Sequence, residues 1–121
     1  MRVALVAVAL SMLWLGCPAP TASGAAARTA APVTGVEARS LIASGAWLVD
    51  VRTPEEFAQA HLDGARNVPL SDLESALGTL PKDKPVIVYC AVGARSARAA
   101  QRLVQAGVDV RNLGAMDNWN R

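Results

Sequence analysis

Downstream of Thr34, short apolar runs alternate with stretches in which apolar residues recur at helical spacing. The clearest runs cover residues 47–51 and 86–89, and their length and β-branched content favour buried strands. Small and apolar residues recur along one helical face between Ala97 and Gly107, which predicts a helix. Strands that alternate with helices at such short intervals are typical of an α/β domain with a mainly parallel sheet.

Three Ser/Thr-x-x-Glu patterns predict where helices begin, because each can form a reciprocal capping box. They lie at residues 34–37, 53–56 and 71–74. The first helix should end by Gly45, a natural left-handed residue at a helix end, and the third should run toward Leu80. The other predicted elements are strands over 65–69 and 108–110 and a short helix or coil over 116–119.

The first 33 residues have a different pattern and predict a leader and a tether. Arg2 precedes an apolar segment from Val3 to Leu15, shorter than the roughly 20 residues that span a bilayer, so residues 1–17 are interpreted as a signal peptide. LWLGC at 13–17 resembles a bacterial lipobox ending at Cys17; cleavage at the A-x-A pattern of 25–27 is the alternative. Residues 18–33 then form a flexible Ala/Pro/Ser linker, and residues 34–121 form the domain. Export would place this domain in the periplasm or bacterial cell envelope, tethered to the membrane if Cys17 carries lipid.

Composition and charge argue against nucleic acid binding and against a metal site. The 121 residues suffice for one domain. Twelve Lys and Arg stand against ten Asp and Glu, a net charge of +2 that is too weak and dispersed to indicate nucleic acid binding. Two cysteines and one histidine are too few for a thiolate-rich metal site, so we expect no metal. A disulfide between Cys17 and Cys90 is formally available, but Cys17 lies in the predicted leader.

The candidate chemistry lies between Tyr89 and Ser96, where a buried strand, a tight loop and a helix start follow one another. Cys90 would lie at the carboxyl end of a central strand, where open α/β sheets bind ligands. The free amides and dipole of the following helix would lower the pKa of the thiol. Gly93 permits the turn that aims these amides inward, and Arg95 adds a planar cation for an oxyanion. From this chemistry alone, a buried structural cysteine beside a solvated arginine is the competing interpretation.

Several motifs, in order and covering nearly all of residues 34–121, resemble the rhodanese-like domain family. They are LVDVR at 48–52, EEF at 55–57, HLDGA at 61–65, NVPL at 67–70, YCxxGxRS at 89–96, VxNLG at 110–114 and Trp119. The family includes small periplasmic single-domain thiosulfate sulfurtransferases, which this sequence also resembles. The resemblance implies a central, mainly parallel sheet with helices on both faces and no cofactor. It also implies that sulfur moves from thiosulfate or a similar donor, through a persulfide on Cys90, to cyanide, a thiol or a protein acceptor.

The resemblance assigns roles around Cys90. Arg95 would bind the donor's oxyanion, and Asp50 and Arg52 would brace the loop without touching substrate. His61 is expected to be structural. The backbone amides of the loop would hold the persulfide; they belong to Ala91, Val92, Gly93, Ala94 and Ser96.

Two other functions compete with sulfur transfer. A cysteine-dependent phosphatase or arsenate reductase uses a related loop, but such enzymes typically place one more residue between the cysteine and the arginine, which makes room for a phosphate ester. A non-catalytic rhodanese-like binding module is the other alternative, which the presence of both Cys90 and Arg95 disfavours.

Overall fold

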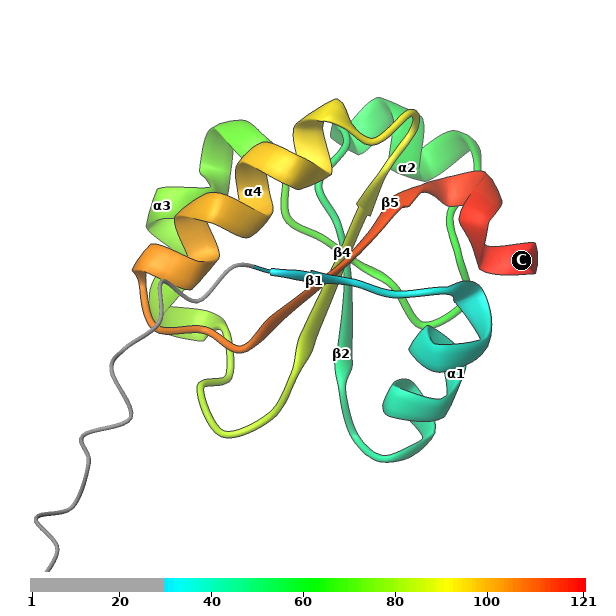
Figure 1. Ribbon diagram of the computed structural model, residues 1–121. Helices are drawn as coiled ribbons and strands as arrows, with labels where there is room; N and C mark the ends of the chain where they lie inside the picture. Colours follow the sequence, from blue (N-terminus) through cyan, green and yellow to red (C-terminus); the bar gives the residue numbers. More distant parts are fainter. Residues whose placement is uncertain (1–29) are drawn as a thin grey trace, which may run out of the picture.

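A computed structural model describes residues 30–121 and shows a parallel five-stranded sheet within them, in the order β1-β5-β4-β2-β3 (Figure 1). The strands are β1 (Ala31–Pro32), β2 (Trp47–Asp50), β3 (Arg66–Asn67), β4 (Val86–Cys90) and β5 (Val110–Ala115). The α-helices are α1 (Gly35–Ala43), α2 (Pro54–Gln59), α3 (Leu73–Ala76) and α4 (Ala94–Gln105), with 3-10 turns η1 (Leu70–Asp72), η2 (Leu77–Thr79) and η3 (Met116–Asn120). The predicted α/β class with a parallel sheet is therefore confirmed. Over residues 30–121, no helix combines the length and apolar character needed to cross a membrane.

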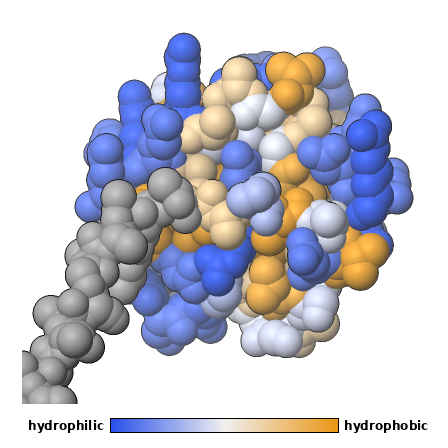
Figure 2. Space-filling model, viewed as in Figure 1, coloured by the Kyte–Doolittle hydropathy of each residue, from blue (hydrophilic) through white to orange (hydrophobic). Residues whose placement is uncertain are grey.

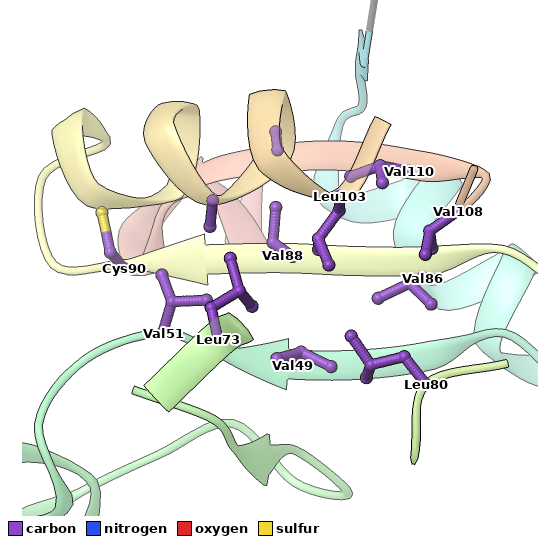
Figure 3. Packing of buried hydrophobic residues seen from close by; sticks show 12 residues of the cluster. Val49, Val51, Leu73, Leu80, Val86, Val88, Cys90, Leu103, Val108 and Val110 are labelled. Atoms are coloured by element: carbon purple, nitrogen blue, oxygen red, sulfur yellow. The ribbon is translucent and has the colours of Figure 1, made fainter. Parts of the chain in front are cut away.

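Helices cover both faces of the sheet, as expected (Figure 1). Side chains of a parallel strand alternate between the faces, so neighbouring residues of β4 enter different cores. Val86, Val88 and Cys90 pack with Leu73 of α3 and Leu103 of α4 (Figure 3). The opposite core joins side chains from β2, β4 and β5 to α1 and η3, and consists of Ala38, Ala46, Leu48, Leu62, Ile87, Tyr89 and Leu113, with Trp119 packed against it. β4 is buried along its whole length and is the central element of both layers.

Of the predicted capping boxes, the one at 34–37 forms and the one at 71–74 does not. At 34–37 both halves of the box form, and α1 ends before Gly45, whose φ is 106°. The box predicted at 71–74 is wrong: Ser71 lies inside η1 and caps nothing, because Leu70 already donates its N–H to the carbonyl of Val51 at 3.1 Å and starts the turn earlier. The single helix expected toward Leu80 is instead divided into η1, α3 and η2.

Two predicted boundaries also differ from the structure. Ala31 and Pro32, which lie in the predicted linker of 18–33, pair with β5 as an edge strand, a position that tolerates proline. The last strand was expected at 108–110, but Val108 still donates its N–H to the carbonyl of Leu103 and closes α4, so β5 begins at Val110. The predicted signal peptide of 1–17, with Cys17, lies outside the described residues.

A buried ion pair fixes the chain where β2 leads into α2. Asp50 is 0% exposed and accepts from Arg52, with Nη2 to Oδ2 at 2.6 Å and the Arg52 backbone N–H to Oδ1 at 2.9 Å. Arg52 also donates to the carbonyl of Ala60 just past α2, and Asn67 donates to the carbonyls of both Asp50 and Arg52. These contacts join β2 and β3 to both ends of α2. That the pair also braces the loop after Cys90 stays a prediction.

Replacing Asp50 by asparagine should destabilise the protein strongly, because it leaves the Arg52 guanidinium buried without a counter-charge. We expect the free energy of unfolding to fall by about 3–5 kcal/mol, measured by urea denaturation. Asp109→Asn is the matched control, since the Asp109–Arg111 pair has side chains 46% and 31% exposed. Its loss should cost no more than about 1 kcal/mol. Equal effects of the two variants would contradict the bracing role.

Candidate active site

Cys90 ends the central strand of the sheet, as predicted. It pairs with Ala115 of β5, and its side chain points to the core face shared by Val51 and Leu73, toward the start of α4 (Figure 3). The residue is 0% exposed and is the free cysteine of the described part of the chain. A reagent can therefore reach the sulfur only if neighbouring groups move.

The loop after Cys90 turns its amides back onto the sulfur. Gly93 precedes the first turn of α4 with φ of 108°, a left-handed conformation that glycine adopts without strain. This geometry aims the Gly93 N–H at Cys90 Sγ, with N and S 3.0 Å apart. Ser96 is fully buried in the first turn of α4, and its hydroxyl donates to the Gly93 carbonyl at 3.0 Å, which holds the turn closed.

Two opposing effects act on the pKa of Cys90. Burial raises the pKa, because a thiolate loses hydration inside the protein. Hydrogen bonds from the Ser96 hydroxyl and from the amides of Ser96, Gly93 and Val92 lower the pKa, and together they prevail, so that the net shift is downward. The Ser96 hydroxyl has one proton for two acceptors, and its position between the Gly93 carbonyl and the sulfur lets it serve either. The site therefore stabilises a thiolate, the nucleophilic form of cysteine.

The predicted loop residues divide into two groups. The amides of Val92, Gly93 and Ser96 belong to the groups that act on the sulfur. Ala91 and Ala94 are exposed, and the Val92 side chain, 82% exposed, projects away from the protein. The loop thus presents backbone to Cys90 and only small apolar side chains to solvent.

Arg95 engages a partner that the sequence did not indicate. Its guanidinium makes a two-pronged contact with the Glu56 carboxylate, with Nη1 to Oε2 at 2.9 Å and Nη2 to Oε1 at 3.2 Å. The hydrogen bond from Arg95 is the main cause that lowers the pKa of Glu56. The capping box predicted at 53–56 is therefore only half formed: Thr53 accepts from the Glu56 N–H, while the Glu56 carboxylate turns to Arg95.

Other polar groups near the site are structural. The His61 ring is exposed, stacks on Phe57 with centroids 3.8 Å apart, and hydrogen-bonds the Phe57 carbonyl through Nδ1. Tyr89 accepts from the Leu62 N–H on the opposite face of the sheet, and burial raises its pKa to about 12.

Within residues 30–121, no three His, Cys, Asp or Glu side chains gather as a metal site would require. Hydrophilic side chains dominate the side of the molecule formed by α3 and α4 (Figure 2), where Arg98 and Arg102 are exposed.

Gly93→Ala should raise the pKa of Cys90, because a left-handed alanine is strained and relaxation would carry the amide away from the sulfur. Loss of one hydrogen bond to a charged group corresponds to about one pKa unit. The pH midpoint of Cys90 alkylation, followed by peptide mass mapping, should rise by that amount. Gly107→Ala imposes the same strain at the far end of α4, where φ is 84°, and should leave the midpoint unchanged. A midpoint unaffected by Gly93→Ala would show that the amide does not act on the sulfur.

Comparison with known proteins agrees with this geometry. The sequence profile of the rhodanese-like domain matches residues 34–121. The chain is 46% identical over 76 residues to the uncharacterized protein YqhL of Bacillus subtilis, covering 61% of this chain and 60% of that protein. It is 38% identical over 71 residues to the thiosulfate sulfurtransferase PspE of Escherichia coli, covering 56% of this chain and 68% of PspE. The solved structure of the human single-domain sulfurtransferase TSTD1 superposes with a TM-score of 0.60 at 34% identity, over 77% of this chain and 96% of TSTD1. The chain is a member of the rhodanese-like domain family.

Proposed function

We propose that this protein is a rhodanese-type sulfurtransferase that carries sulfur as a persulfide on Cys90. The observation that carries the proposal is the buried thiol whose pKa is lowered by the amides and hydroxyl of its own loop. Relatives named sulfurtransferases support the activity, and PspE, named a thiosulfate sulfurtransferase, supports thiosulfate as donor.

In the first step the Cys90 thiolate attacks the outer sulfur of thiosulfate. A bond forms between Sγ and that sulfur while the sulfur–sulfur bond of thiosulfate breaks, and sulfite leaves with the bonding electron pair. The amides of Val92, Gly93 and Ser96 act on the Cys90 sulfur, and in our proposal they also stabilise the resulting persulfide anion. We assign the sulfonate oxygens to Arg95 on the first turn of α4, whose guanidinium is held by Glu56 in this structure.

In the second step an acceptor removes the outer sulfur and regenerates the thiolate. Cyanide would leave as thiocyanate, and a thiol or a protein cysteine would leave as its own persulfide. The sequence has only Cys17 and Cys90, and Cys17 belongs to the predicted leader, so an external acceptor must complete the cycle. The predicted leader also supports location in the periplasm or cell envelope.

Intact mass spectrometry tests the persulfide directly. After reduction and incubation with thiosulfate, the wild-type protein should gain one sulfur atom, and cyanide should remove it. Cys90→Ser should gain none. Phosphate esters should not be hydrolysed, because the loop has one residue fewer than a phosphatase loop. No mass gain on the wild type, or Cys90-dependent release of phosphate from an ester, would overturn the proposal.

A further inference from the structure

Arg95, the cation closest in sequence to Cys90, already has a counter-charge in Glu56. Arg95 is held by both oxygens of Glu56, which is the geometry in which a guanidinium also binds a sulfonate or carboxylate of a ligand. Arg52, just past the end of β2 that pairs with β4, is buried against Asp50 and is not free to take the place of Arg95. Glu56 therefore occupies the group that an anionic donor needs.

The Arg95–Glu56 pair lies where an anion from solution can take the place of the Glu56 carboxylate. The side chains of Arg95 and Glu56 are 32% and 38% exposed, so a dissolved anion can approach them. The buried pair differs, because the side chains of Arg52 and Asp50 are only 9% and 0% exposed. Exposed ion pairs are worth little, and their partners separate at small cost. The contact also joins α2 to the first turn of α4, next to the loop that covers Cys90.

We propose that Glu56 is an internal competitor for the anionic group of the sulfur donor. The inference rests on the proposed function for its biological meaning. In the resting protein the Glu56 carboxylate holds Arg95; the donor's sulfonate displaces it while the outer sulfur reaches Cys90. When the sulfur–sulfur bond breaks, sulfite remains on Arg95 and the Glu56 carboxylate displaces it in turn. Glu56 thus weakens the binding of donor and of product alike, and it discriminates against anions that bind Arg95 less well than it does.

A pair of alkylating reagents isolates this effect from sulfur transfer. Iodoacetate and iodoacetamide react with the same thiolate, but iodoacetate carries a carboxylate where iodoacetamide carries a neutral amide. Glu56→Gln should raise the ratio of their rates at Cys90, iodoacetate over iodoacetamide, by about two- to fivefold, the range expected for freeing an exposed ion-pair partner. The KM for thiosulfate and the inhibition constant of sulfite should fall by the same factor.

Two variants serve as controls. Glu55→Gln removes the same charge from the exposed neighbouring position of α2 and should leave the ratio unchanged. Adding Arg95→Gln to Glu56→Gln should abolish the gain, because the freed guanidinium is then absent. A ratio that stays high in the double variant would show general charge repulsion and overturn the proposal. An unchanged ratio in Glu56→Gln, or an equal change with both reagents, would make the pair a structural contact and overturn it as well.

These outcomes separate the two proposals. If wild-type protein takes no sulfur from thiosulfate but the alkylation ratio responds as described, the proposed function fails and the competition at Arg95 stands. If the persulfide forms on the wild type and neither the ratio nor the thiosulfate KM responds to Glu56→Gln, the competition fails and the proposed function stands.

Discussion

The contact on which the rest of the site depends is the one between the Gly93 amide and Cys90 Sγ, 3.0 Å apart. A buried thiol would ordinarily be a poor acid, because the interior disfavours its charged form. Here the chain itself replaces the lost water with amides of the loop and the hydroxyl of Ser96, and the net effect is a lowered pKa. The same groups would stabilise the charge on the outer sulfur of a persulfide, so one arrangement serves both the attack and its product.

The surrounding fold keeps this loop in place. β4 is buried from Val86 to Cys90 between two helical layers, so the end of the strand has little freedom. On one side the Asp50–Arg52 pair fixes both ends of α2, and α2 carries Glu56 to Arg95. A buried pair thus supports an exposed pair, and in our proposal the exposed pair exchanges with the anion of the donor beside Cys90.

The sequence predicted the position of Cys90 and of the loop after it because their determinants are local. A β-branched run sets the strand, Cys90 follows it, and Gly93 supplies the left-handed residue before α4. Glu56 was missed as a site residue because its partner lies 39 positions away, and the nearby Thr53 offered a local explanation for the glutamate. Tertiary contacts also explain the other differences. Ala31 and Pro32 form a strand by pairing with β5, and Ser71 caps no helix because η1 already begins at Leu70, whose N–H bonds the Val51 carbonyl.

The most direct test of the central claim is the ionisation of Cys90 itself. The ultraviolet absorbance of the thiolate should be followed against pH in wild-type protein, with the signal of Cys90→Ser subtracted to remove Cys17 and the tyrosine. The account predicts a titration at a pH clearly below that of an ordinary cysteine. A transition at or above the ordinary value would show that burial outweighs the loop's hydrogen bonds, and the thiolate cradle would have to be abandoned.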